Sequence, residues 1–310
     1  MEYHIKPLSK QNLKDVQYLY RKVFNNKVNL YFVTKKFDTS YLRKNYFGHL
    51  AYYNNEPVAF HGAIPVAMTY NKKTELAAQY GDAMTIKEHT GKGLFTKLGK
   101  LTDTLLQQEG ITFVWGFPNQ NSQYGYLHKL DWQYKTRMHG FKIKTSKLPI
   151  EKVLQKTILT KKMYQQYIEK VFLQYKVDEI INGSVFIEDN VVTVKRDKDY
   201  FTYKNFTNNF CVKISETLFW IKINNGVLVG DIKTKSKNHF YDSLKTLKKI
   251  AAHCGIQQII FQSPPNTLIY NFLTNSNCEH FESWIIGYKN FNSAFPLENL
   301  KLTFGDLDTF

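Results

Sequence analysis

One stretch of the chain restricts its fold more than any other. Between residues 76 and 117 an apolar strand, a glycine turn, an amphipathic helix and a second apolar strand follow one another. The segment 76–86 has the pattern of a strand, and leucines recur at helical spacing from Leu94 until Gly110. The run 111–117 is too short for a helix and suits a buried strand. Because a strand, a helix and a parallel strand form a βαβ crossover, we expect an α/β fold.

The glycine turn in this unit stands directly before the helix. A helix N-terminus has unpaired backbone N–H groups and the positive end of the helix dipole, and glycine allows a phosphate to approach closely. Gly91 and Gly93 supply that here. A P-loop is excluded because G-x-x-x-x-G-K-[ST] is absent, and a dinucleotide fingerprint needs a third glycine where Thr96 stands. The loop alone leaves phosphate binding and ordinary turn chemistry both open.

Further strands and helices are predicted before this unit. We expect a helix at 11–24, followed by a helical or irregular stretch to residue 43. The segments 49–53 and 58–70 have the composition of strands, and Asn54-Asn55 between them favours a tight turn. The sequence therefore predicts a hairpin ahead of the βαβ unit.

The pattern of the first half returns in the second half, after a lysine-rich connector with two helical stretches that begins at Leu148 and Pro149. The returning elements are a hairpin of 219–223 and 227–232, a helix at 240–254 and a strand at 256–261. We interpret this as an internal repeat. The expected domains are 1–145, a helical connector at 146–185, and 186–310.

The second copy is shorter than the first. Asn55 and Gly110 are 55 positions apart, whereas Asn225 and Gly255 are 30 apart. We interpret the missing 25 residues as one strand and the glycine loop, since KTKSKNHF stands where the first copy has EHTGKGLF. The second half is therefore expected to support structure or substrate binding, not to hold a second cofactor.

Composition limits the class of protein. The chain has 310 residues, of which 43% are hydrophobic, and no run of about 18 uncharged apolar residues. Its first residues lack the apolar block of a signal peptide, so we expect a cytoplasmic protein without membrane insertion. The net charge is +16, but the lysines are scattered, which favours a solvated basic surface or an anionic ligand over nucleic acid. Cys211, Cys254 and Cys278 form no CxxC pair and have no histidine cluster beside them, so no metal site is expected.

The order of strand, glycine loop, helix and strand, followed by PNQNSQYGYLHKLDW, resembles the GNAT superfamily of acetyl-CoA-dependent N-acetyltransferases. The pyrophosphate loop of that family is R/Q-x-x-G-x-G/A. Gly93 matches its first glycine, Thr90 stands in place of Arg or Gln, and Phe95 in place of the last Gly or Ala. The segment GDAMTIKEHTGKGLFTKL is similar to a GNAT branch often linked to sugar or polysaccharide acetylation. The resemblance covers residues 1–145 and implies a tandem GNAT fold, with mixed twisted sheets flanked by helices and a reduced second copy.

The resemblance also implies a binding site for acetyl-CoA. In this family the pantetheine arm pairs with the strand before the loop, the pyrophosphate takes N–H groups of the loop, and an Asn after the next strand touches the arm. The matching residues are Met84, Thr85 and Ile86 for the arm, Thr90, Gly91, Lys92, Gly93, Leu94 and Phe95 for the pyrophosphate, and Asn119 or Asn121. Because Thr90 lacks a positive charge, Lys87, Lys92 or Lys97 are expected to assist.

Acetyl transfer to an amine needs a proton acceptor and a way to stabilise the leaving thiolate. Asp82, a carboxylate in an otherwise apolar strand, is the first candidate acceptor, and an ion-paired structural role is its alternative. His61 and Glu88 are weaker candidates. The tyrosine that acts as acid in the family aligns with Leu127, so Tyr124 and Tyr126 are candidate replacements, or simply aromatic walls.

The end of the chain offers one more candidate. In the enhanced-intracellular-survival family of tandem GNAT proteins the terminal carboxylate is the base, which would here be that of Phe310; docking for stability is the alternative. Glu298, Asp306 and Asp308 are alternatives for holding the hydroxyls or ammonium of an amino sugar.

These observations predict an acyltransferase that moves an acetyl group from acetyl-CoA to a primary amine of a small molecule, with an amino sugar as the suggested acceptor. The alternatives are a non-catalytic CoA-binding or nucleic-acid-binding module, and a tRNA-dependent aminoacyl transferase of tandem GNAT fold. The sequence does not determine the oligomeric state.

Overall fold

The computed structural model describes residues 2–146, 150–154, 156–183 and 185–310. Leu148 and Pro149, where the connector was expected to begin, lie outside them. The chain forms two compact units. Unit 1 contains the residues up to Thr136 together with Asn190–Lys195 and Trp284–Leu300, and unit 2 contains Arg137–Asp189, Arg196–Ser283 and Lys301–Phe310. The segments of the units alternate along the chain, and the domain boundaries at 145 and 185 stay a prediction.

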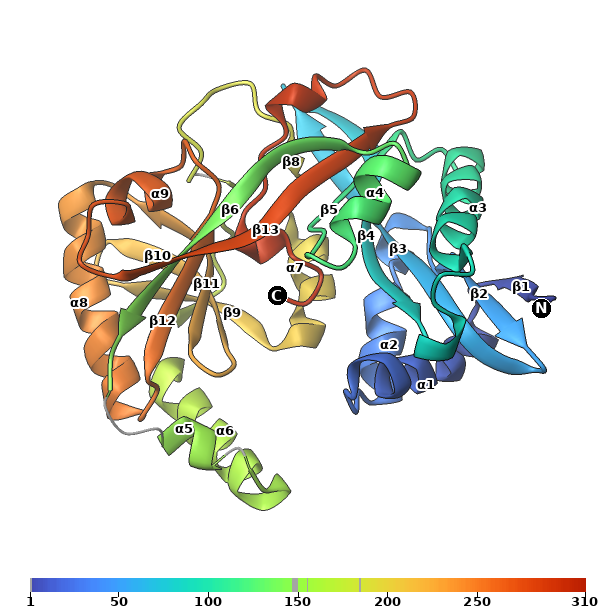
Figure 1. Ribbon diagram of the computed structural model, residues 1–310. Helices are drawn as coiled ribbons and strands as arrows, with labels where there is room; N and C mark the ends of the chain where they lie inside the picture. The colour runs from blue at the N-terminus through green and yellow to red at the C-terminus, as the bar shows by residue number, and fades with distance from the viewer. Residues whose placement is uncertain (1, 147–149, 155, 184) are drawn as a thin grey trace. The chain divides into compact units, whose positions relative to one another are not determined.

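Unit 1 is a mixed sheet flanked by helices, as expected (Figure 1). Its strands, in spatial order, are β1 (His4–Pro7), β2 (Phe47–Tyr53), β3 (Glu56–Tyr70), β4 (Lys73–Thr85), β5 (Phe113–Gly116) and the end of β13 (Glu279–Asn290), and β8 (Thr193–Val194) pairs with β3. Its helices are α1 (Leu13–Phe24), α2 (Leu30–Phe37), α3 (Leu94–Gln108) and α4 (Gln123–Lys129).

The predicted hairpin is confirmed as β2 and β3. Asn54 and Asn55 join the two strands with φ of 49° and 64°, a left-handed pair that Asn adopts more easily than most residues. Side chains alternate across β3: Phe60 packs edge-on against Phe37 of α2, whereas Ala59 lies in one cluster with Leu94 and Leu98 of α3. The helices α1 and α2 therefore cover one face of the sheet and α3 covers the other.

The predicted βαβ unit is also confirmed. β5 is parallel to β4, with Ala78–Tyr80 opposite Val114–Gly116, and α3 connects the two strands. The connector contains the two expected helical stretches, α5 (Ile150–Leu154) and α6 (Ile158–Leu173).

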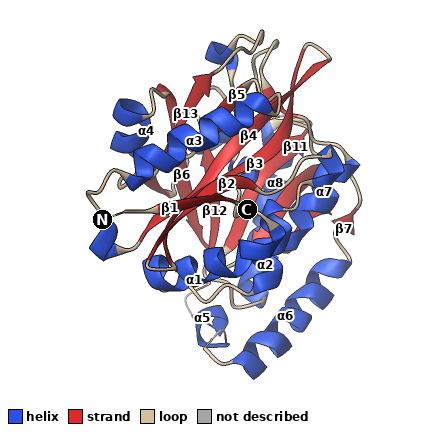
Figure 2. Ribbon diagram, turned by 90° about the vertical axis from the view of Figure 1, so that its right-hand side faces the viewer, coloured by secondary structure: helices blue, strands red, loops and turns tan. Residues whose placement is uncertain are grey.

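Unit 2 is a second mixed sheet with helices against it (Figure 2). Its strands, in spatial order, are β6 (Gln133–Lys144), β12 (Gln258–Ser263), β11 (Val227–Thr234), β10 (Thr217–Ile223), β9 (Asn209–Ile214) and β7 (Lys176–Val177). Besides α5 and α6 it contains α7 (Lys198–Lys204), α8 (Lys237–His253) and α9 (Leu268–Leu273). Its core contains a cluster that includes Phe219, Phe240 and Phe261.

The two units share one topology. In unit 1 the antiparallel strands β2, β3 and β4 are followed by α3 and by β5, parallel to β4. In unit 2 the strands β9, β10 and β11 are followed in the same way by α8 and by β12, parallel to β11. The last strand is exchanged: β6 follows β5 in sequence but pairs with β12, and β13 follows β12 but pairs with β5. This shared topology supports the internal repeat.

The second copy is reduced, but our interpretation of a lost strand was wrong. The topology makes the turn before β11 equivalent to the turn at Asn71-Lys72 before β4, not to the earlier turn at Asn54-Asn55. The reduction lies in one strand and its loop. β4 has 13 residues and reaches α3 through residues 86–93, whereas β11 has 8 and reaches α8 through residues 235 and 236 alone.

Candidate active site

The glycine loop turns the chain from β4 into α3. Gly91 and Gly93 have φ of 72° and 75°, and Gly93 is the N-cap of the helix. A Cβ atom built on either glycine would meet nothing within 4 Å. These positions therefore require glycine for the left-handed backbone, and the space above them is open.

The loop presents a row of backbone donors. Within the part of the chain that the structure describes, no N–H group from Gly91 to Thr96 donates a hydrogen bond, and the first of the helix to do so is that of Lys97, to Gly93 at 3.0 Å. These adjacent donors lie at the positive end of α3, a helix of 15 residues. Such an arrangement binds anions, and phosphate groups in particular.

The edge of β4 is open next to this loop. β4 pairs with β5 only as far as Tyr80, opposite Gly116. From Gly81 to Thr85 its single neighbour among the described strands is β3. Peptide groups on the other edge of this segment are therefore available to an extended ligand, in the same way as at a sheet edge. In this segment Met84 is buried and Thr85 is half-buried. The N–H group of Ile86, the next residue, donates a hydrogen bond to the carbonyl of Val58 at 2.9 Å.

A β-bulge lies where β4 leaves β5. Between the pairs Phe60–Met84 and Gly62–Gly81, β4 has two residues and β3 has one. Asp82 is one of the two, with φ of 60°. Bulges of this kind redirect a side chain and end strand pairing. The bulge places the carboxylate of Asp82 on the face of the sheet that α1 and α2 cover.

Asp82 is held by two residues that were not predicted from the sequence. Its carboxylate oxygen Oδ2 is 2.7 Å from Nζ of Lys36 and accepts a hydrogen bond from the hydroxyl of Tyr20. Lys36 also donates to that hydroxyl at 3.1 Å. The Lys36 side chain is 0% exposed and that of Asp82 is 8% exposed. Asp82 therefore forms the ion pair that was expected as the alternative to catalysis. Its role as proton acceptor stays a prediction.

Tyr126 lies in the interior and Tyr124 at the surface. The hydroxyl of Tyr126 is 3.3 Å from Nε2 of His61, and its ring packs against those of Phe95 and Trp132. Tyr124 is 63% exposed, and its ring lies tilted against that of His128. Of the two alternatives for Tyr126, the aromatic wall describes its packing. A catalytic role for either tyrosine stays a prediction.

His61 is buried beneath the first turn of α3. Burial, together with the nearby charge of His49, lowers the pKa of His61 to about 3, so its ring is neutral at neutral pH. Its Nδ1 has no hydrogen-bond partner among the described residues. The ring lies edge-on to Tyr80 and Phe95. His61 therefore belongs to an aromatic core, and its Nδ1 makes no hydrogen bond within the described residues.

The two asparagines after β5 differ in their surroundings. The side-chain oxygen of Asn119 accepts hydrogen bonds from the backbone N–H groups of Asn121 at 3.0 Å and of Ser122 at 3.1 Å. Asn119 thus forms the turn that leads into α4. Asn121 is exposed. A contact of either side chain with a cofactor stays a prediction.

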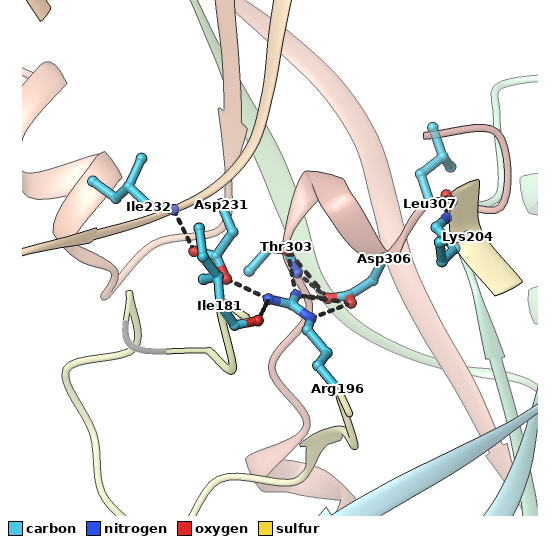
Figure 3. Close-up of polar contacts among 8 residues, drawn as sticks. All are labelled: Ile181, Arg196, Lys204, Asp231, Ile232, Thr303, Asp306 and Leu307. Atoms are coloured by element: carbon cyan, nitrogen blue, oxygen red, sulfur yellow. Dashed lines mark hydrogen bonds and ion pairs between the residues drawn. The ribbon is translucent and has the colours of Figure 1, made fainter. Parts of the chain in front are cut away.

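The end of the chain is docked inside unit 2. Phe310 is 1% exposed and its ring lies edge-on to Trp220, and one oxygen of its main-chain carboxylate accepts a hydrogen bond from the hydroxyl of Thr207. Asp306 is also buried, in a bidentate pair with Arg196 in which both of its oxygens are 2.8 Å from Nη2 (Figure 3). Its carboxylate is therefore committed to Arg196, which corrects the alternative that Asp306 holds a sugar. Docking of Phe310 for stability is what the packing supports.

Unit 2 repeats the arrangement around Asp82, a repetition that was not predicted from the sequence. β11 pairs with β12 only as far as Val229, and the Gly-Asp dipeptide Gly230-Asp231 follows, just as Gly81-Asp82 follows Tyr80. Asp231 is paired with the fully buried Arg196, as Asp82 is with Lys36 (Figure 3). Burial raises the pKa of Asp231 to about 6 despite the opposing effect of Arg196.

Among the described residues, however, a loop of free donors follows the Gly-Asp dipeptide in unit 1 alone, because residues 235 and 236 join β11 to α8 directly. The buried ion pair thus belongs to the shared fold, whereas the donor row belongs to unit 1. The signal that could have found Lys36 and Arg196 is the repeated Gly-Asp dipeptide. It predicts a buried carboxylate in each unit, and a buried carboxylate needs a cation.

Two kinds of feature are absent from the described residues. No helix among them has both the length and the apolar character needed to cross a bilayer. In the same residues, no three His, Cys, Asp or Glu side chains are grouped so as to hold a metal ion.

Comparison with known proteins places this site in a family. The sequence model of the acetyltransferase (GNAT) domain matches residues 4–135. No curated protein matches the chain. Among solved structures, the GCN5-related N-acetyltransferase from Kribbella flavida is 9% identical, over 93% of this chain and 72% of that chain, with a TM-score of 0.55. The one from Anabaena variabilis is 11% identical, over 93% and 73%, with a TM-score of 0.52.

A third solved structure is the Saccharomyces cerevisiae N-myristoyltransferase with bound myristoyl-CoA. It is 14% identical, over 97% of this chain and 89% of that chain, with a TM-score of 0.56. At such identities the likeness concerns the fold. The family match, by contrast, covers the glycine loop, the open edge of β4 and the bulge at Asp82. Residues 4–135 of this chain therefore match the acetyltransferase (GNAT) domain, which supports an acyltransferase.

Proposed function

We propose that this protein transfers an acetyl group from acetyl-CoA to a primary amine of a small molecule, with an amino sugar as the acceptor. One observation carries the proposal: the row of unpaired N–H groups from Gly91 to Thr96 lies directly after the open edge of β4. Anion-binding donors beside a free strand edge match two adjoining parts of CoA, the pyrophosphate and the amide-containing pantetheine arm. The fold generally uses an acyl-CoA, and the choice of acetyl is part of the proposal.

In this proposal the pyrophosphate lies on the loop and the pantetheine arm on the edge of β4, along Met84, Thr85 and Ile86. Thr90 does not replace the charge of an arginine, and its hydroxyl donates to the carbonyl of Lys87 at 2.7 Å, within the loop itself. Backbone donors therefore provide most of the contacts to phosphate. The exposed Lys92 and Lys97 add positive charge nearby.

The acceptor amine approaches from the side of the bulge. Its nitrogen attacks the thioester carbonyl carbon, the carbon–sulfur bond breaks, and CoA leaves as a thiolate. The proton released by the amine passes to the carboxylate of Asp82, next to Tyr20. A thiolate is a tolerable leaving group, so this scheme requires no separate acid. The Phe310 carboxylate remains the second candidate base.

The test begins with cofactor binding. Calorimetry compares the binding of acetyl-CoA with that of myristoyl-CoA, and acetyl-CoA should bind. Absence of binding at millimolar acetyl-CoA would reject the proposal. Release of free CoA is then measured with a panel of primary amines that includes glucosamine and galactosamine. Turnover with an amino sugar supports the proposed acceptor, and turnover only with other amines limits the proposal to acetyl transfer.

Asp82→Asn should keep the affinity for acetyl-CoA and lose turnover, because the amide cannot accept the proton. Asp231→Asn is the matched control, since it changes the equivalent aspartate in the unit that has no glycine loop. Equal turnover in Asp82→Asn and the unmodified protein would assign the proton to another group. Turnover of Asp82→Asn that persists, but is lost on removal of Phe310, would identify the terminal carboxylate.

A further inference from the structure

An apolar surface on α5 and α6 has no part in the site described above. Twelve large hydrophobic side chains are exposed in the part of the chain that the structure describes, and half of them fall between residues 150 and 173. These six are Ile150, Val153, Leu159, Met163, Tyr167 and Leu173. We call them the α5–α6 surface. Single exposed apolar residues are ordinary, but a concentration on two adjacent helices needs an explanation.

The helix α6 has two apolar faces. Tyr164, Ile168 and Phe172 are buried and belong to the core cluster of unit 2. Leu159, Met163 and Tyr167 form a second row at the same spacing of four positions. They are 70%, 61% and 40% exposed. A surface helix normally has polar residues outside its core face. Packing within unit 2 therefore accounts for the first row and not for the second.

The segment that contains the exposed row is rich in lysine. The segment 150–173 contains Lys152, Lys156, Lys161, Lys162 and Lys170, all of them exposed. None takes part in an ion pair within the described residues. Of the two acidic residues here, Glu151 is buried and accepts a hydrogen bond from the N–H of Gly226, so Glu169 alone offsets the lysines at the surface. The segment thus combines six exposed apolar side chains with five exposed lysines and one exposed acid.

We propose that the α5–α6 surface binds to the surface of a bilayer that contains anionic lipids. Such a bilayer offers negative headgroups to the lysines, and apolar chains within about 5–10 Å beneath them to Leu159 and Met163. A second copy of this chain would bring the same five lysines against the first set and would be repelled. Figure 1 shows α5 and α6 at one end of unit 2, beyond the ends of its strands.

The geometry fits attachment along the surface and not insertion across it. α6 has 16 residues, fewer than the roughly 20 that span a hydrocarbon core. Its lysines and its buried face also exclude a surrounding of lipid on all sides. The proposal does not depend on the acetyltransferase activity, because neither the glycine loop nor Asp82 belongs to these helices.

The test is co-sedimentation of the full chain with vesicles. Vesicles of phosphatidylcholine with phosphatidylserine should bind the protein, vesicles of pure phosphatidylcholine should bind it much more weakly, and added salt should weaken the binding. Lys162→Glu with Lys170→Glu should reduce the affinity at least about 25-fold, since each lysine near an anionic surface accounts for about fivefold. Leu159→Ser with Met163→Ser should reduce it about tenfold or more while leaving the salt dependence in place.

Two control variants match these changes elsewhere in unit 2. Lys248→Glu with Lys249→Glu makes the same change of charge on the exposed side of α8, and Ile187→Ser removes an apolar side chain that is 48% exposed. Both should bind as the unmodified protein does, and thermal unfolding checks that all variants are folded. Lack of binding to mixed vesicles overturns the proposal, and so do controls that weaken binding equally. Unchanged binding by the Leu159 and Met163 variant would leave only unspecific charge attraction, which also overturns it.

Discussion

Gly93 fixes the geometry of the candidate phosphate site. Its φ of 75° is a conformation that residues with a side chain rarely adopt, and a Cβ atom built on it would meet nothing within 4 Å. A glycine of similar geometry stands two residues beyond the other end of the same helix. Gly110 has φ of 78°, and a Cβ atom added there would meet nothing within 4 Å, as at Gly93. The two glycines are therefore matched in strain and differ only in place.

Gly93→Ala and Gly110→Ala should each lower the free energy of unfolding by about 1 kcal/mol, because both force alanine into the left-handed region. Only Gly93→Ala should weaken acetyl-CoA binding, by about tenfold, since it disturbs the donors that face the pyrophosphate. Urea unfolding and calorimetry measure the two effects. Equal affinities for acetyl-CoA in the two variants would show that the loop does not bind the cofactor.

His61 makes stability depend on pH in a defined window. Its pKa is lowered by burial to about 3, below the ordinary value of 6.5, so the folded state favours the neutral ring. The stability from this group is fully present above pH 6.5 and is lost progressively as the pH falls towards 3. Burial also lowers the pKa of His49, which adds a change of the same sign.

His61→Phe should therefore flatten the loss of stability in acid. Between pH 6.5 and 4.5 the unmodified protein should lose about 2 to 3 kcal/mol through His61, and the variant should not. Phenylalanine suits the aromatic surroundings of Tyr80 and Phe95. The measurement is urea unfolding at both pH values, and an unchanged slope in the variant would contradict this account of His61.

Among the elements, the C-terminal segment distinguishes unit 2 from unit 1. Its short helix Phe304–Asp306 is tied to β11 through Arg196, and a Cβ atom on Gly230 would come within 2.5 Å of the ring of Phe310 and 2.8 Å of Gly305. The C-terminal segment thus covers the bulge of β11. The bulge in the equivalent strand of unit 1, β4, contains Asp82. Burial lowers the pKa of Arg196, but Asp306 and Asp231 outweigh it and raise that pKa.

Asp306→Asn should lower the free energy of unfolding by about 3 kcal/mol, because it leaves the buried Arg196 with Asp231 as its one remaining carboxylate partner in the described residues. The affinity for acetyl-CoA should not change, since the substitution lies in unit 2. Chemical denaturation and calorimetry on the same samples measure both quantities. Asp178→Asn, an exposed position of unit 2, serves as the neutral comparison. A loss of cofactor affinity in Asp306→Asn alone would connect the tail to the site.

Over the whole molecule, the repeat was visible in the sequence but its alignment was not. The hairpins, the crossover helices and the parallel strands of both halves were predicted. The turn at Asn224-Asn225 resembles the turn at Asn54-Asn55 in sequence, so these two were predicted to be equivalent. The order of the strands shows instead that the turn before β11 is equivalent to Asn71-Lys72 before β4. The exchange of β6 and β13 was not predicted either, since pairing between distant strands leaves no local pattern.

The sequence by itself determined the glycine loop, the helix after it and the strands on either side. Periodicity, left-handed turns at Asn and Gly, and N-terminal donors are properties of neighbouring residues. Only the tertiary structure decided the surroundings of Asp82. Tyr20 is 62 positions away, and a lysine in the buried face of α2 is recognised as a partner only when the bulge of β4 is placed against it. A buried charge requires an opposite charge, but packing alone selects which residue supplies it.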